Sequence, residues 1–485
     1  MRNLTLLTDF YELTMMQAYH QTELTTGRKQ IAVFDMFYRE NPSGNGYVIV
    51  AGLAQLIDYI NEIEFNEEDI TYLRSTGVFK EEFLKYLRGF KFTGTLFAVP
   101  EGTVIFPGEP IIRVTAPLLE GQLIETALLN IINHQSLIAT KASRVCWAAK
   151  GDRVLEFGLR RAQGPDAGLY GARAAMIGGC AGTSNVLAGQ LFDVPIRGTH
   201  AHSWIMSFDT EIEAFRRYAE LYPTACILLV DTYDTLKSGV PNAITVFTEM
   251  KNRGITLQNY GIRLDSGDLA YLSKQARLKL DAAGFTDAFI SASNDLDEYV
   301  ISELKAQGAQ VSVWGVGTHL ITSKEYPALG GVYKMAALST DNNQWIPKMK
   351  LSEDPIKVTN PAAKKIFRLY GKESGKMKAD LITLQDEKID ITQDLTIFDP
   401  LATWKQMTLK AGEYTARELL EPVFIDGKCV YPNYTVSEIC EYSKKERDTL
   451  WDEHKRLVRP QIMPIDLSQK LYDLKQSMIK SLRDG

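Results

Sequence analysis

Two of the six histidines in this 485-residue chain stand one residue apart, in the segment GTHAHSW at residues 198–204. They are His200 and His202, and the segment follows a short apolar stretch. Such a pair could ligate a metal, act as a general base, carry a phosphoryl group on a neutral imidazole nitrogen, or make plain polar contacts in a loop. On an extended strand both side chains would point to one face, but no third ligand stands in register. The pattern disfavours a metal site and leaves the other three open.

Arginine- and glycine-containing segments elsewhere in the chain are suited to binding phosphate or carboxylate oxygens. Guanidinium groups offer planar donors for these oxygens, and glycine lets backbone amides approach a phosphate closely. The arginines are Arg160, Arg161 and Arg263, and the glycines are Gly267, Gly315 and Gly317, accompanied by Ser266 and Thr318. No GxxxxGK[ST] sequence occurs, so a nucleoside triphosphate would have to bind in another way.

Four aspartates lie in the same part of the chain: Asp231, Asp234, Asp265 and Asp268. Their carboxylate oxygens suit ribose hydroxyls or magnesium-bound water. Each segment also has a plainer explanation, because DSGD is a common turn and helix cap, and paired arginines often lie on the surface. Together, at the ends of successive strands, these residues favour a site for a phosphorylated sugar with magnesium.

Short apolar strands that alternate with amphipathic helices position these segments. From Arg153 onward the strands read VLEFG, PIRGT, CILLVDT, GIRLD, AFISAS, VSVWGV and VYKMAA. They are too far apart for hairpins, which predicts parallel pairing through right-handed crossovers. A barrel and an open doubly wound sheet both satisfy this pattern, but seven or eight units without a glycine-rich dinucleotide fingerprint favour a barrel. The polar segments then share the carboxyl face, where barrels hold their active sites.

The two ends of the chain predict a second, mixed structure. Residues 91–119 alternate strand-forming residues with glycine and proline turns, which predicts antiparallel strands, and a long helix is expected over 120–149. After about residue 351 the chain is charged and rich in turns, with small strands suited to pack back onto the early sheet. The last 45 residues predict two helices. We expect residues 1–150 and 346–485 to build one domain, with the barrel at 151–345.

Composition excludes several classes of protein. The net charge is −6 and no basic run of five residues occurs, which argues against a nucleic-acid partner. The N-terminus lacks the features of a secretion signal, and no apolar run reaches the roughly 18 to 20 residues of a membrane span. The five cysteines include no CxxC pair, so we expect reduced thiols in a cytoplasmic protein without structural zinc.

Seven segments, taken in order, are similar to the motif series of the nicotinate phosphoribosyltransferases. They are LLTDFYELTM, EFGLRRAQGPDAG, GGCAGTSNVLAG, GTHAHSW, RLDSGDL, GVGT and KLSEDPIKVTNP, and they extend from Leu6 to about Pro361. The resemblance implies a type II phosphoribosyltransferase fold, an irregular α/β barrel beside an α/β sandwich built from both chain ends. It implies that nicotinate and 5-phosphoribosyl 1-diphosphate become nicotinate mononucleotide and diphosphate, the entry step of NAD salvage from nicotinate. It also implies magnesium, ATP as a co-substrate hydrolysed through a phosphohistidine, and a homodimer with shared active sites.

The resemblance further implies roles for individual residues. His202 is the phosphorylated residue, whereas His200 occupies a family position that need not be histidine. Tyr11, donated by the other subunit, and Phe157 stack on either side of the pyridine ring. The other implied contacts are Arg160 beside the base and diphosphate, Thr199 and Arg263 on nicotinate, Asp265 near the ribose or magnesium, Gly317 and Thr318 around the 5-phosphate, and Asn294. Ser266, Gly267 and Gly315 complete the substrate-binding set, and His202, Arg160, Arg263 and Asp265 form the catalytic set.

One position bears on the choice of substrate. Relatives that use nicotinamide have an aspartate after the Gly-Thr of the corresponding motif, whereas AGTSNV has Ser184. An aspartate would repel the carboxylate of nicotinate and a hydroxyl would not, which favours the acid. Two alternatives are a nicotinamide phosphoribosyltransferase and a non-catalytic sensor that binds nucleotides.

Overall fold

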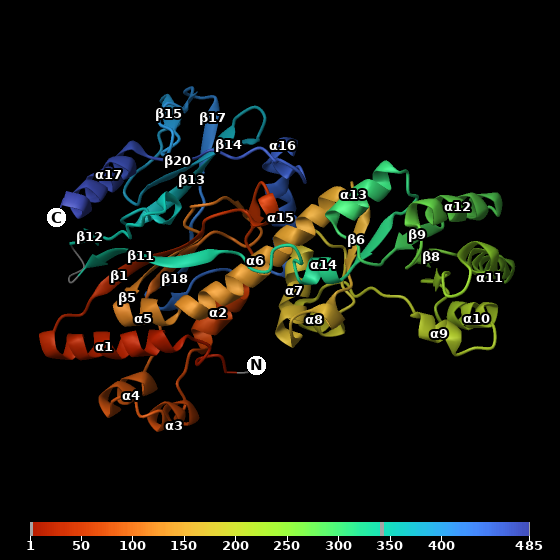
Figure 1. Ribbon diagram of the computed structural model, residues 1–485, viewed down its shortest axis with the longest axis horizontal. Helices are drawn as coiled ribbons and strands as arrows, with labels where there is room; N and C mark the ends of the chain where they lie inside the picture. Colours follow the sequence, from red (N-terminus) through yellow and green to blue (C-terminus); the bar gives the residue numbers. More distant parts are fainter. Residues whose placement is uncertain (1–2, 340–343, 485) are drawn as a thin grey trace. The chain divides into compact units, whose positions relative to one another are not determined.

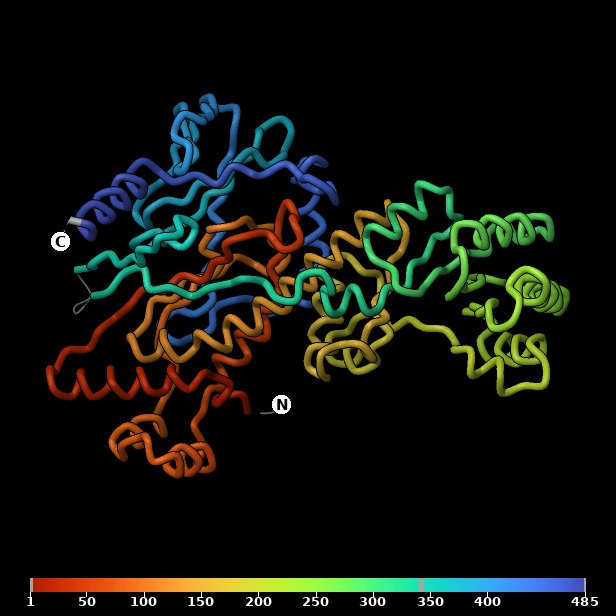
Figure 2. Tube along the Cα trace, in the orientation of Figure 1, coloured from red at the N-terminus to blue at the C-terminus, as the bar shows by residue number. Residues whose placement is uncertain are grey.

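The computed structural model describes residues 3–339 and 344–484, and its chain forms two compact units. Unit 1 comprises Met1–Leu137 and Ala328–Gly485, and unit 2 comprises Ile138–Pro327. Figure 2 follows the chain out of unit 1 and back, so the red and blue ends of the trace belong to the same unit. Within the described residues, no helix is both long enough and apolar enough to cross a membrane.

Unit 1 contains most of the strands and the helices of both chain ends (Figure 1). Its helices are α1 Phe10–Thr26, α2 Leu53–Glu62, α3 Glu67–Ser75, α4 Glu81–Arg88, α5 Leu118–Leu123, α15 Val436–Thr449, α16 Asp452–Lys455 and α17 Gln469–Asp484. Its strands are β1 Ile31–Tyr38, β2 Val48–Ile49, β3 Thr95–Ala98, β4 Val104–Ile105, β5 Ile112–Pro117, β11 Gly331–Ser339, β12 Ile346–Pro347, β13 Lys364–Gly371, β14 Met377–Leu384, β15 Leu395–Phe398, β16 Gln406–Leu409, β17 Tyr414–Glu418, β18 Glu421–Ile425, β19 Lys428–Cys429 and β20 Ile465–Leu467.

The largest sheet of unit 1 is antiparallel and combines strands from both ends of the chain. Its order is β12-β11-β1-β5-β3-β18-β19. β1 lies in its interior, and side chains on both faces of β1 are buried. β18 pairs with β3, so the predicted return of the C-terminal segment onto the early sheet is confirmed.

A smaller sheet, in the order β17-β13-β14-β20, carries its own apolar core. Leu369, Leu381 and Tyr414 are among the buried residues of that core. Arg368 on β13 is fully buried, and its guanidinium pairs with Asp380 at 2.6 Å. Burial of this charge is tolerated because its partner is buried beside it.

Unit 2 alternates short strands with helices, as predicted from residue 153 onward. The long helix α6, Glu125–Ala148, leads into it. Its strands are β6 Arg153–Glu156, β7 Ile227–Leu229, β8 Gly261–Leu264, β9 Phe289–Ala292 and β10 Val313–Val316. Its α-helices are α7 Pro165–Gly178, α8 Val186–Phe192, α9 His202–Met206, α10 Glu211–Leu221, α11 Val240–Asn252, α12 Leu269–Ala282, α13 Glu298–Ala306 and α14 Thr318–Ile321. Asp268 and Asp297 accept backbone N–H groups as the N-caps of α12 and α13, which is how these helices begin.

The five strands of unit 2 form a parallel sheet in the order β6-β10-β9-β8-β7. Single parallel bridges extend it beyond β6 to Thr183 and then to Ile196. The strand order therefore runs from Ile196 through Thr183, β6, β10, β9 and β8 to β7, and among the described residues no backbone hydrogen bond joins Ile196 to β7 to close a barrel. The mixed α/β class and the parallel sheet are confirmed, but the closed ring is interrupted at this junction.

Two predicted strands of the barrel differ in the structure. PIRGT contributes a single bridge at Ile196 rather than a strand. VYKMAA, predicted as the last parallel strand, belongs to β11 and pairs antiparallel with β1 of unit 1. Apolar and polar residues alternate in the same way in parallel and antiparallel sheets. The pattern alone therefore assigned β11 to the parallel sheet of unit 2 instead of the antiparallel sheet of unit 1.

Candidate functional site

The carboxyl ends of β7, β8 and β9 hold a cluster of hydrogen-bonded side chains with Arg263 at its centre. Arg263 donates from Nε to Ser293 Oγ at 2.9 Å, from Nη1 to Thr199 Oγ1 at 3.0 Å and from Nη2 to Asp265 Oδ1 at 3.0 Å. Its side chain is 18% exposed. All three nitrogens are held by protein oxygens, so the guanidinium is oriented before any ligand binds.

Two aspartates continue this cluster. Asp265 Oδ1 also accepts a hydrogen bond from the Ser293 hydroxyl. Asp231 Oδ2 accepts from the backbone N–H of Asp265 at 2.8 Å and from Ser266 Oγ at 2.7 Å. Its other oxygen, Asp231 Oδ1, is buried and has no hydrogen-bond partner in the described structure. An unpaired buried carboxylate oxygen calls for a donor or a cation from outside the chain.

His202 is the first residue of α9, and its side chain is 39% exposed. Its Nε2 lies 3.8 Å from Asp265 Oδ2, and its Nδ1 lies 3.1 Å from the Thr232 hydroxyl. A carboxylate on the Nε2 side favours the tautomer that carries its proton there. In that tautomer the lone pair is on Nδ1, where it can accept the hydrogen bond of the Thr232 hydroxyl.

His200, two residues earlier, has a different environment. It is only 8% exposed and packs edge-on against Tyr218, with ring centres 4.6 Å apart. Its Nε2 accepts the backbone N–H of Leu229 in β7 at 3.3 Å. Burial lowers the pKa of His200 to about 4, and the nearby charge of Arg263 adds to the effect. A neutral imidazole thus takes the place of a backbone acceptor at the interrupted junction of the sheet.

Phe157 and a glycine shape the neighbouring wall. The guanidinium carbon of Arg263 lies 5.9 Å from the centre of the Phe157 ring, within the range of a cation–π contact. A Cβ on Gly315 would lie 2.7 Å from Phe157 Cδ2, so only glycine leaves room for this ring. Gly267 has a positive φ of 78°, which lets the DSGD turn lead into α12.

A buried carboxylate at the carboxyl end of β6 was not predicted from the sequence. Glu156 accepts from the backbone N–H of Gly158 and from Thr183 Oγ1 at 2.6 Å, and burial raises its pKa. It holds the start of the loop that carries Arg160. An acidic residue inside an apolar strand is the only signal that could have pointed to it.

Other sequence-predicted residues lie outside these hydrogen bonds. Arg160 and Arg161 are exposed on the short helix Leu159–Arg161, and Ser184 donates its backbone N–H to Glu156 O at 3.0 Å. Asn294 is exposed, with a φ of 96° that side chains rarely adopt, which is common at ligand sites. Gly317 and Thr318 begin α14, after β10. Tyr11 lies on α1 of unit 1 and is 48% exposed.

The two other aspartates have structural roles. Asp234 and Asp268 each accept backbone N–H groups at the first turn of the helix that follows. The plainer interpretation, a helix cap, therefore describes their contacts. The hydroxyls of Ser293 and Thr232 touch the cluster but were not predicted, because a single hydroxyl after a strand carries no distinctive pattern.

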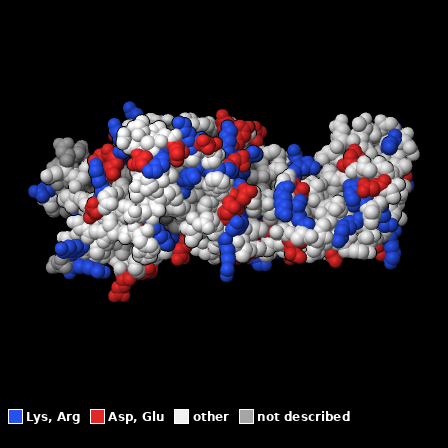
Figure 3. Space-filling view, turned by 90° about the horizontal axis from the view of Figure 1, so that it is seen from above, with Lys and Arg blue, Asp and Glu red and all other residues white. Residues whose placement is uncertain are grey.

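Charge is mixed on the surface. On the face shown in Figure 3, basic and acidic side chains of the described residues are interspersed. This face carries no continuous basic track of the kind that binds nucleic acid.

Three family models match the chain. The model of the nicotinate phosphoribosyltransferase N-terminal domain matches residues 6–133, that of the nicotinate phosphoribosyltransferase family matches 153–369, and that of the C-terminal domain matches 363–475. Together they cover most of the sequence.

Individual proteins similar to this chain belong to the same family as the matching family models. Nicotinate phosphoribosyltransferase of Bacillus subtilis is 45% identical over 99% of this chain and 96% of its own length. That of Caenorhabditis elegans is 36% identical over 96% of this chain and 92% of its own length. The crystal structure of human nicotinic acid phosphoribosyltransferase superposes with a TM-score of 0.84 at 30% identity, covering 97% of this chain and 99% of that one. The chain therefore belongs to the nicotinate phosphoribosyltransferase family of enzymes.

Proposed function

We propose that this enzyme joins nicotinate to 5-phosphoribosyl 1-diphosphate and that ATP drives the reaction through a phosphoryl group carried on His202. The observation that carries the proposal is the convergence of two segments at one edge of the parallel sheet: Thr199 and His202 meet Arg263 and Asp265, although Thr199 and Arg263 are 64 positions apart in the sequence. That edge is where parallel α/β folds bind their ligands.

Nicotinate is a planar ring with a carboxylate, and both parts find matching groups. Arg263 uses one N–H of Nη1 and one of Nη2 on protein oxygens, so one N–H remains on each for a carboxylate. Phe157, in contact with the same guanidinium, offers a flat face to the pyridine ring. Arg263 also neutralises the acid, which a neutral amide substrate does not require.

The transfer itself needs little proton chemistry. The bond from ribose C1 to the diphosphate oxygen breaks while the pyridine nitrogen forms its bond to C1, so positive charge develops on the sugar. Asp265 supplies negative charge nearby, and Arg160 is placed by resemblance beside the departing diphosphate. Catalysis of this kind rests on positioning and on charge stabilisation.

Magnesium fits the residues present. Asp231 Oδ1 is buried and has no hydrogen-bond partner within residues 3–339 and 344–484, and carboxylates together with water are the ligands that magnesium prefers. Asp231 and Asp265 would hold the ion with its waters. When bound it would neutralise charge on the diphosphate.

His202 has the surroundings of a phosphoryl acceptor. In the proposed step its Nδ1 attacks the γ-phosphorus of ATP, the bond to the bridging oxygen breaks, and ADP leaves. Nε2 keeps its proton and faces Asp265, whose charge stabilises the imidazolium formed. Attack of water on the phosphorus later releases inorganic phosphate and restores the neutral ring.

The test is to count ADP formed per nicotinate mononucleotide in wild type and in His202→Ala, with ATP labelled at the γ position. We expect an acid-labile label on the wild-type protein, no label on the variant, and residual transfer that no longer responds to ATP. Equal ADP formation by both proteins would refute the phosphohistidine while leaving the transferase assignment intact.

We further propose that the enzyme is a homodimer in which Tyr11 completes the site of the other subunit. Tyr11 and Phe10 are both about half exposed on α1, as is common for aromatic side chains that anchor an interface. The check is complementation: Tyr11→Ala and Arg263→Ala proteins, each weakly active, should regain activity when their subunits are mixed. A monomer in sedimentation, or no recovery on mixing, would contradict shared sites.

A further inference from the structure

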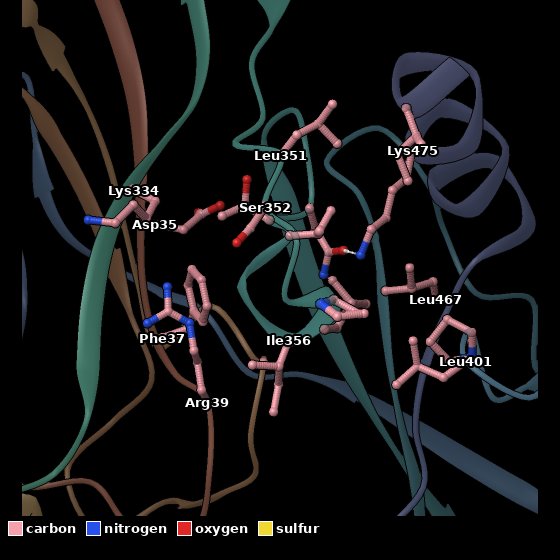
Figure 4. A pocket seen from close by; sticks show the side chains of 18 of the residues that line it. Asp35, Phe37, Arg39, Lys334, Leu351, Ser352, Ile356, Leu401, Leu467 and Lys475 are labelled. Atoms are coloured by element: carbon pink, nitrogen blue, oxygen red, sulfur yellow. Dashed lines mark hydrogen bonds between the residues drawn. The ribbon is translucent and has the colours of Figure 1, made fainter. Parts of the chain in front are cut away.

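A cavity of about 530 Å³ lies within unit 1 and contains none of the predicted site residues. Its walls come from β1, β11, β14, β20, α17 and the loop between β12 and β13 (Figure 4). This volume is typical of sites that bind small organic molecules.

Two polar atoms in its wall are buried and unpaired. Asp35 is 3% exposed; its Oδ2 lies 2.7 Å from Lys364 Nζ, but its Oδ1 has no hydrogen-bond partner in the described structure. Arg39 stands four positions later, just after the end of β1, and its buried Nε likewise has no hydrogen-bond partner among the described residues. Buried polar atoms are nearly always hydrogen-bonded, so this pair marks a place where a ligand could donate to Asp35 and accept from Arg39.

A third polar group faces the cavity from α17. Lys475 Nζ donates to Asn360 Oδ1 at 2.8 Å, the dashed contact in Figure 4, and within the described residues no carboxylate pairs with it. Burial and the charge of Lys364 lower the pKa of Lys475 to about 8. A desolvated ammonium without an anion beside it is costly unless an anion arrives from outside.

The cavity has an excess of positive charge. Its charged lining residues are Arg39, Lys334, Lys364, Lys475 and Arg483 against Asp35 and Glu353. The rest of the lining is largely apolar and includes Phe37, Ile356 and Leu467, which Figure 4 shows around the same space. A small inorganic ion would leave this apolar surface in contact with water, whereas an organic anion with an apolar body would cover it.

We propose that this cavity is a second binding site, for a small organic anion that has an apolar body and a hydrogen-bond donor. The anionic group lies between Arg39 and Lys475, the donor meets Asp35 Oδ1, and the body packs against Ile356 and Leu467. The site is independent of the proposed reaction in unit 2.

The probe is 8-anilino-1-naphthalenesulfonate, which combines a sulfonate, an N–H and two aromatic groups and fluoresces when bound. N-phenyl-1-naphthylamine has the same body without the sulfonate and serves as the neutral control. With the whole 485-residue chain we expect one saturable site for the anionic probe and at least tenfold weaker binding of the neutral one.

Variants locate the probe. Lys475→Met should weaken binding of the anionic probe at least tenfold, and Lys470→Met, an exposed lysine on the same helix, should leave it unchanged. Arg39→Gln provides a second test should Lys475→Met fail to fold. Unchanged affinity in Arg39→Gln and in a folded Lys475→Met, displacement of the probe by nicotinate with 5-phosphoribosyl 1-diphosphate, or non-saturating binding would each overturn the proposal.

Discussion

Two arginines, one in each unit, show how differently a site can be prepared for a ligand. Arg263 in unit 2 has all three nitrogens bonded to Ser293, Thr199 and Asp265. Arg39 in unit 1 has a buried Nε with no hydrogen-bond partner in the described part of the chain. The first is held in place by the protein and keeps its geometry when empty, as a catalytic group must. The second has an N–H group that no described protein atom accepts, so a bound ligand could supply the missing acceptor.

Removing Arg263 is the most direct test of its proposed catalytic role. Arg263→Ala takes away the charge for nicotinate and leaves Asp265 and Ser293 without their donor. We expect kcat/KM to fall about 10³-fold, roughly 4 kcal/mol. The stability should fall by only about 1–3 kcal/mol, the cost of hydrogen bonds left unmade.

Steady-state kinetics and urea unfolding measure the two effects. Arg216→Ala is the matched control, because Arg216 pairs with Glu249 on the surface of the same unit. A collapse of stability with Arg263→Ala would mean that this cluster supports the fold more than the chemistry.

A second prediction adds a charge at Ser184, next to the end of β6. Ser184 donates its backbone N–H to Glu156 O, and by resemblance its side chain faces the substrate. In Ser184→Asp the new carboxylate would repel that of nicotinate, so we expect kcat/KM for nicotinate to fall about 100-fold, roughly 3 kcal/mol. The value for nicotinamide should fall much less. Equal losses on both substrates would remove Ser184 from the choice of substrate.

Much of this arrangement is predictable from the sequence. The polar segments after VLEFG, CILLVDT and GIRLD lie at the carboxyl ends of β6, β7 and β8, because parallel strands place their ends at one edge. The shared sheet of both chain ends was also expected, because the strands predicted over residues 91–119 and the small strands after about residue 351 each need a partner.

The remainder depends on contacts that no local pattern encodes. The interruption between Ile196 and β7 depends on His200 reaching Leu229 N–H, a contact between residues 29 positions apart. The hydroxyl of Ser293 joins Arg263 and Asp265 only because β9 lies beside β8. Residues 39 and 475 line the same cavity of unit 1 although they stand at opposite ends of the chain, which only the folded structure reveals.

His200 is a third kind of polar group: it is buried, and among the described residues its ring hydrogen-bonds only to a backbone N–H, that of Leu229. Its pKa is about 4 in the fold and near 6.5 when unfolded. The unfolded chain therefore binds the proton first as pH falls, so this contribution is complete above pH 6.5 and is lost between 6.5 and 4.

We expect the free energy of unfolding to fall by about 2 kcal/mol more in wild type than in His200→Gln between pH 7 and pH 5. Glutamine keeps an acceptor for Leu229 N–H and does not titrate. Urea unfolding at the two pH values measures the difference. Parallel losses in both proteins would show that other groups control the acid sensitivity.

The smallest effect is expected in the cavity of unit 1 and has the opposite sign. Lys475→Met removes an ammonium whose pKa burial holds at about 8, together with one hydrogen bond to Asn360. Because the desolvation of the charge outweighs a single bond to an amide, we expect the empty protein to become more stable by about 1 kcal/mol at pH 7. The matched surface variant Lys470→Met should be unchanged. If Lys475→Met gains stability and loses anion binding, the cavity, unlike the cluster around Arg263, keeps its polar groups for a ligand at the expense of the fold. A loss of stability would instead show that Lys475 is a structural residue.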